Sequence, residues 1–224
     1  MKRFMMLLLC LFIPLSVLAE DEQFIQQRID DIGTKLLNAN KIEKRVVFVY
    51  SDEDKQSLLD MDTMLESGQV IVYRNIYKNI EDDNELAAGL ARGISNSIKS
   101  FDGLWGGTLT ALQIKLAPKK FEIVADKRAV DFMVKAGFDP VAEIIYIHKI
   151  SPQKRHDFLS NKNLASKRLA IIYEYIYTKY PYFLANNQYI NNEHYQNFLL
   201  TSVNNRKLLE EKVKSGSSKK LKYE

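Results

Sequence analysis

The stretch EIVADKRAVDFMVKAGFDPVA, residues 122–142, predicts two consecutive helices joined by a short turn. Its residues follow a helical pattern up to Gly137, a residue typical of the C-terminal end of a helix. Asp139 and Pro140 follow as a cap and first turn for the next helix. We therefore expect one long helix to end at this glycine and a second to begin directly after it.

Helical patterns also dominate the chain on both sides of this stretch. Residues 24–37 carry apolar side chains at helical spacing, which predicts an amphipathic helix. Further helices are expected at four places: from Glu85, from Ser151-Pro152, from Ala165 and over about 195–213.

Two short runs predict strands. The runs RVVFVY at 45–50 and QVIVYR at 69–74 are rich in β-branched and aromatic residues. The Gly-rich run FDGLWGGT at 101–108 lacks the lysine of a phosphate-binding loop, so it predicts a connecting loop. The expected fold class is α+β, mostly helical, with a small sheet.

The first 19 residues, MKRFMMLLLCLFIPLSVLA, have the organisation of a secretory signal peptide. Two basic residues precede an apolar run, and Val17 and Ala19 occupy the small-residue positions of a cleavage site. The apolar run is shorter than the roughly 20 residues that span a bilayer. We therefore expect export, with cleavage near Ala19 and a periplasmic or other cell-envelope location.

Length and composition favour one exported domain. Removing 19 of the 224 residues leaves 205, which suits a single domain over 20–214. The one cysteine, Cys10, lies in the leader, so the remaining chain can form no disulfide and no Cys-based metal site. The formal charge of +4 includes Lys2 and Arg3, and no nucleic-acid-binding motif is recognised. Residues 215–224 predict a basic flexible tail, for which a peripheral membrane contact stays open.

Three separated segments resemble successive motifs of one family of zinc metallopeptidases, which includes HtpX, the CAAX prenyl protease, the mitochondrial Oma protease and the periplasmic protease BepA. ELAAGLARGISNS at 85–97 is similar to the family's HExxH helix, and EIVAD at 122–126 to its ExxAD motif. FLSNKNLASKRL at 158–169 is similar to the STHP motif with its following arginine. The resemblance covers about 46–168 and implies a zincin-like metallopeptidase fold, with a small sheet against the active-site helix.

The residues that zinc chemistry requires are replaced at the matched positions. Arg92, Gly93 and Asn96 stand where the family has the His, Glu and His of HExxH, and Lys162 and Asn163 replace a His-Pro pair. In HExxH the two imidazoles bind zinc and the glutamate acts as general base on the zinc-bound water. A guanidinium offers only hydrogen-bond donors, and glycine offers no base. We therefore expect no metal and no other cofactor.

Three matched positions keep the family's residue. By the resemblance Glu122 is the third zinc ligand and the only ligand position retained, Asp126 is the aspartate behind the ligands, and Arg168 is the arginine near the cleft. Because positions 92 and 122 converge on the metal in the family, we expect Arg92 to pair with Glu122 in place of the ion. The alternative is that Arg92 points to solvent.

The resemblance also assigns a role to the second predicted strand. In the family this strand lies along the cleft and binds extended peptide by main-chain pairing, which needs no zinc. The candidate peptide-binding residues are Gln69, Val70, Ile71, Val72 and Tyr73. An ordinary half-buried strand is the alternative.

The histidines lie outside every matched position. None of them forms an HxxxH pair with another, so each is expected to be an ordinary surface or packing residue. They are His148, His156 and His194.

The lost motif favours a catalytically inactive peptidase-like protein, a pseudopeptidase that binds a peptide or protein partner in the cell envelope. One alternative is an active zinc metalloendopeptidase with an unconventional site, for which zinc would be the cofactor. The other is a non-catalytic surface protein that acts through its basic tail. The sequence leaves the oligomeric state open.

Overall fold

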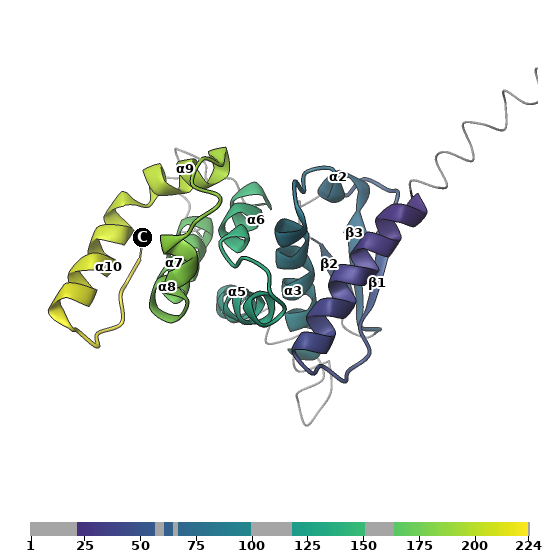
Figure 1. The fold of residues 1–224 in the computed structure, drawn as a ribbon, viewed down its shortest axis with the longest axis horizontal. Coiled ribbons are helices and arrows are strands. Elements are labelled where there is room, and N and C mark those ends of the chain that lie inside the picture. Colours follow the sequence, from purple (N-terminus) through teal and green to yellow (C-terminus); the bar gives the residue numbers. More distant parts are fainter. Residues whose placement is uncertain (1–21, 57–60, 65–66, 100–117, 151–163, 224) are drawn as a thin grey trace, which may run out of the picture.

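The structure is a computed structural model that describes residues 22–56, 61–64, 67–99, 118–150 and 164–223. Over these residues the protein is mostly helical α+β, with a small sheet at one end and helices stacked away from it (Figure 1). None of the described helices is both long and apolar enough to cross a membrane. The predicted leader, the Gly-rich run and the helix expected from Ser151 lie outside the described residues.

The sheet has three strands in the described part of the chain, in the order β1-β3-β2. The two predicted strands are present as β1 (Val47–Ser51) and β3 (Gln69–Tyr73), which pair in parallel. The third, β2 (Asp62–Met64), pairs antiparallel with β3 and was not predicted, because three residues carry too short a pattern. The sheet is therefore mixed, and β3 is its central strand.

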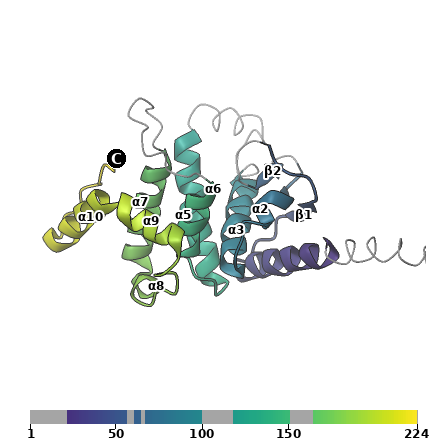
Figure 2. The ribbon, with the colours of Figure 1, turned by 90° about the horizontal axis from the view of Figure 1, so that it is seen from above.

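Two helices cover one face of this sheet. Phe48 of β1 and Val70 of β3 are partners in the register, so their side chains point to the same face. The Phe48 ring packs on Gly33 of the helix formed by residues 22–39, while Val70 packs on Gly93 of α3 (Asp83–Lys99). Figure 2 shows these two helices beside the sheet. The helix predicted over 24–37 is confirmed, and α3 begins two residues before the predicted Glu85.

The remaining helices extend the structure away from the sheet. α3 contacts α5 and α6, α5 and α6 contact α7, and α6 also contacts α9. The helices predicted from Ala165 and over 195–213 are confirmed, the second as two separate helices. The helices of this part are α5 Pro118–Lys135, α6 Ala142–Ile150, α7 Leu164–Lys179, α8 Pro181–Ala185, α9 Glu193–Thr201 and α10 Val203–Ser215. The short helix α2, Arg74–Tyr77, directly follows β3.

The turn between α5 and α6 has the predicted form. Gly137 takes a positive φ of 76° and donates its N–H to Val134 O, while the Phe138 N–H bonds to Met133 O. This is the Schellman arrangement, which satisfies the last carbonyl groups of a helix. Asp139 then accepts the Val141 N–H at 2.9 Å through Oδ1 and caps the start of α6.

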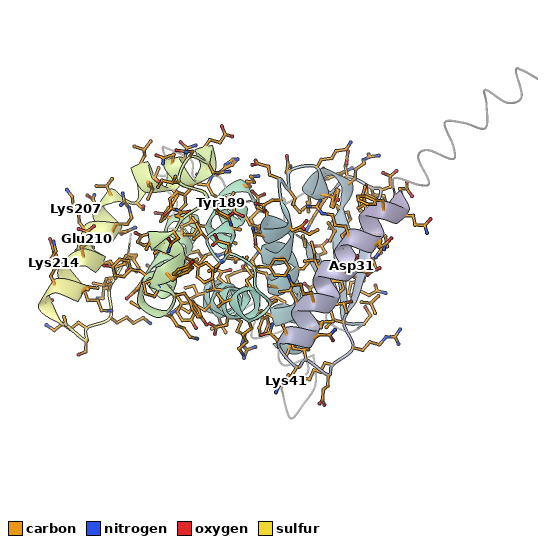
Figure 3. All side chains as sticks on the ribbon, viewed as in Figure 1. Asp31, Lys41, Tyr189, Lys207, Glu210 and Lys214 are labelled. Carbon is orange, nitrogen blue, oxygen red and sulfur yellow. The ribbon has the colours of Figure 1, made fainter. Side chains whose placement is uncertain are left out.

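The C-terminal tail follows helix α10. α10 directs Lys207, Glu210 and Lys214 outward (Figure 3) and buries Leu209 against the body. The chain then turns back, and Tyr223 is 4% exposed. The basic flexible tail over 215–224 stays a prediction, and the structure adds that the Tyr223 ring is buried.

Candidate functional site

Helix α3 carries the central residue of the site and is buried along most of its length. A reciprocal cap fixes its start: Asp82 Oδ1 accepts the Glu85 N–H at 2.8 Å, and Glu85 Oε2 accepts the Glu81 N–H at 3.2 Å. Beyond this cap its apolar residues are fully buried, from Leu86 to Ile94. A helix that is buried along most of its length is enclosed by other elements on several sides. The sheet lies against one side of α3, and α5 and α6 lie against another.

Arg92 lies in the middle of this buried helix and is 2% exposed. Its Nη2 lies 2.7 Å from Glu122 Oε2, and its Nε lies 3.0 Å from Asp126 Oδ1. The same Nε is 3.7 Å from Glu143 Oε1. One guanidinium thus connects three helices, α3, α5 and α6, through carboxylates. The expected pairing of Arg92 with Glu122 is present, and the alternative of a solvent-directed Arg92 is excluded.

Arg168 of α7 completes the arrangement from the opposite side. Its Nε donates to Asp126 Oδ2 at 2.9 Å and its Nη2 donates to Asp126 Oδ1 at 2.8 Å, a bidentate pair. The Nη2 also lies 3.2 Å from Glu122 Oε2. Asp126 is 1% exposed and accepts three N–H groups from two arginines. Asp126 therefore has a structural role, since it joins α3 and α7 to α5.

We call Arg92, Glu122, Asp126, Glu143 and Arg168 the ion-pair cluster. Glu122 forms its rim, since 36% of its side chain is exposed, whereas Asp126 and Glu143 are enclosed. Carboxylates buried in this way are tolerated only when cations or donors compensate them. The cluster therefore joins α3, α5, α6 and α7, and its guanidinium groups hold the oxygen atoms that a metal would need.

The donor set does not fit zinc. Arg92 offers no lone pair to a cation, and Glu122 is the one matched ligand position that carries an acceptor of the right type. Within the described residues, no three His, Asp or Glu side chains are grouped so that they could hold a metal ion. Asn96 is half-buried one turn after Arg92, and no described hydrogen bond joins it to the cluster. Lys162 and Asn163, which stand at the matched His-Pro positions, lie outside the described residues.

Gly93, the position matched to the general base, has a packing role that the sequence did not reveal. A Cβ atom built there would lie 2.6 Å from Val70 Cγ1 of β3, closer than a real contact allows. The absence of a side chain therefore lets α3 approach the central strand. A glutamate at this position would have to displace Val70, so this face of α3 offers no room for a base.

The predicted peptide-binding strand is not an edge strand. Over Gln69 to Ile71, β3 pairs with β1 on one side and with β2 on the other. The main-chain N–H and C=O groups on both sides of β3 pair with neighbouring strands over these residues. A peptide therefore cannot add to β3 there as a further strand. The side chains of Val70 and Val72 are fully buried. The prediction of main-chain peptide pairing by this strand is corrected accordingly.

Glu143 is the member of the cluster that sequence reasoning missed. It is a single acid in the apolar helix AEIIYIHKI and is fully buried. A lone acid among apolar residues is a signal for a buried pair, because a carboxylate without compensation would be costly there. The pattern indicates burial, but it does not identify Arg92 as the neighbour.

A second polar group involves two of the three histidines. His148 of α6 and His194 of α9 lie with their Nδ1 atoms 3.1 Å apart, a contact that the sequence did not indicate. Burial lowers the pKa of both imidazoles below the usual range. Beside them, Lys149 Nζ donates to Asn79 O, Glu81 Oε1 and Glu85 Oε2. These groups connect α6 to the start of α3.

Searches of protein-family models, curated protein sequences and solved structures returned no match for this chain.

Proposed function

We propose that this protein is an exported, non-catalytic peptidase-like protein that acts in the cell envelope by binding a peptide or protein partner. In this proposal α3 is the former active-site helix of a zincin-like fold. The observation that supports it is the convergence of Arg92, Glu122, Asp126 and Arg168, four positions that the resemblance alone assigns to one site. Residues 76 positions apart in the chain have no local reason to meet.

The chemistry of the cluster favours binding over catalysis. A hydrolytic site needs a polarising group, a base and access for water. Here the guanidiniums are held by carboxylates, and the position of the base is pressed against Val70. The cluster instead fixes four helices relative to each other, which is what a rigid binding scaffold requires.

The first test measures metal content and proteolysis together. Protein purified without metal and then incubated with zinc should retain none by elemental analysis, and it should not cleave casein. Stoichiometric zinc accompanied by casein cleavage would overturn the proposal in favour of an active metallopeptidase.

The second test asks whether the cluster occupies a former metal site. Arg92→His with Asn96→His would place two imidazoles one helical turn apart, with Glu122 as third ligand. We expect this double variant to bind one zinc per chain, while Arg92→His alone binds it far more weakly. A folded double variant without zinc affinity would argue against the peptidase-like interpretation. Near-ultraviolet circular dichroism checks that both variants are folded.

A further inference from the structure

The last residues of the chain form a strap that returns onto α5 and α7. Gly216 ends α10 with a φ of 63°, and the Ser217 N–H bonds to Lys212 O, which reverses the chain direction. Seven residues after Gly216, the side chain of Tyr223 is buried. We call residues 217–223 the strap.

One acid on α7 holds the strap in place. Glu174 Oε2 accepts the Tyr223 hydroxyl at 3.0 Å, and Glu174 Oε1 lies 2.8 Å from Lys212 Nζ of α10. Burial, and to a smaller extent the neighbouring Glu174 carboxylate, raise the pKa of the Tyr223 hydroxyl, so the hydroxyl stays protonated and donates its hydrogen bond. A single carboxylate therefore fastens both the end of α10 and the end of the chain.

The strap fills its site incompletely. Two adjoining cavities of about 240 and 360 Å³ remain beside Leu221 and Tyr223. Both are lined by Ile123 of α5 and Ile171 of α7, an apolar floor with room left over. We call this surface the α5–α7 groove. Both cavities are large enough to accept further side chains beside the strap.

Lysines from the helices and from the strap gather around the groove. Lys167 of α7 lines the larger cavity together with Lys220 and Lys222 of the strap itself. Lys127 of α5 lines the smaller cavity, where its Nζ lies 5.2 Å from the centre of the Tyr175 ring. Like charges that share a site disfavour binding. A segment with acidic residues in place of the strap lysines would match the groove lysines better.

We propose that the α5–α7 groove is a binding site for an extended, acidic, tyrosine-bearing segment of a protein partner, and that the strap is its displaceable internal occupant. The partner's tyrosine takes the place of Tyr223 on Glu174, and its acidic residues face Lys127 and Lys167. This inference deepens the proposed binding function and rests on it. It places the site on α5 and α7, away from the part of β3 that is already paired on both sides.

The test compares two labelled peptides on the full-length mature chain. One has the strap sequence SSKKLKYE, and the other, SSEELEYE, replaces its three lysines by glutamate. Tyr223→Ser releases the strap, and Tyr182→Ser is the matched control, because Tyr182 is 70% exposed on α8. Affinity is measured by fluorescence anisotropy, and circular dichroism verifies the fold of each variant.

We expect the acidic peptide to bind Tyr223→Ser at least about tenfold more tightly than it binds the parent or the control, because the tethered strap competes in the latter two. Tyr223→Phe, which keeps the ring and loses the hydroxyl, should give an intermediate affinity. The strap peptide should bind more weakly than the acidic one. Adding Glu174→Gln to Tyr223→Ser should weaken binding of the acidic peptide.

Two results would overturn the inference. Equal affinity of the acidic peptide for the parent and for Tyr223→Ser would show that the strap does not guard the groove. Binding of Tyr223→Ser to anionic lipid vesicles, without binding of either peptide, would assign the surface to a membrane instead. Neither result bears on zinc content or casein cleavage, so this test can fail while the non-catalytic assignment stands.

Discussion

Replacing Arg92 by methionine should cost far more stability than replacing a surface arginine. Methionine keeps much of the side-chain volume, so the change removes mainly the charge and its hydrogen bonds. The buried carboxylates of Asp126 and Glu143 would then lose the Arg92 guanidinium, which lies 3.0 Å from one and 3.7 Å from the other. Breaking a buried ion pair from one side typically costs about 3–5 kcal/mol.

The matched control is Arg28→Met. Arg28 pairs with Asp83 at 2.7 Å, but its side chain is 27% exposed and that of Asp83 is 63% exposed. Pairs in such a solvated setting contribute about 0–1 kcal/mol. The two substitutions are chemically identical, so the difference between them reports the burial and the larger number of carboxylate partners of Arg92.

The assay is equilibrium unfolding in urea at neutral pH, followed by circular dichroism. With a slope of about 2–3 kcal/mol per molar urea, Arg92→Met should lower the midpoint by about 1–2 M. Arg28→Met should lower it by a few tenths of a molar at most. Equal midpoints for the two variants would refute the view that the cluster holds the helices together.

Three further predictions concern other parts of the fold. Gly93→Ala should lower the free energy of unfolding in urea by about 1–3 kcal/mol through the clash with Val70, although alanine is the better helix former. Adding Val70→Ala should recover part of the loss. An unchanged midpoint for Gly93→Ala would contradict the close contact. Gly137→Ala should cost about 1 kcal/mol by thermal unfolding, since φ is 76° and the space is open, so a neutral effect would mean that the turn had changed. The neutral pair of His148 and His194 should contribute stability that is complete above about pH 6.5 and is lost as the pH falls, because both pKa values are lower in the fold than in the unfolded chain. The melting temperature of His148→Gln should therefore change less between pH 7.5 and pH 5 than that of the parent.

The features that could be predicted from sequence are those that depend on neighbouring residues. The turn at Gly137 and the cap at Asp139 are local hydrogen-bond arrangements, and the structure confirms both. The pairing of Arg92 with Glu122 is long-range, yet it was expected because the family resemblance supplied a common site for the two positions. Local chemistry and the resemblance thus account for the parts that were foreseen.

The features that were missed depend on contacts between distant segments. Glu143 joins the cluster only because α6 packs on α3, and Tyr223 is buried only because the strap after α10 returns onto α7. The central place of β3 follows from the short strand β2, whose three residues have no recognisable pattern. In each case the local sequence does not identify the partner, because packing between distant segments decides it.

The contact between Val70 and Gly93 also fixes the position of α3 along the sheet. Val70 fits into the gap that Gly93 leaves on α3, where a Cβ atom would come within 2.6 Å. A helix that carries side chains on either side of such a gap cannot slide along the sheet, since a shift of one turn would move it by about 5.4 Å and bring bulk against the valine. Arg92 is the residue just before Gly93 on the helix. The axial position of its guanidinium, on which α5, α6 and α7 converge, therefore depends on two methyl groups of a strand residue outside the cluster.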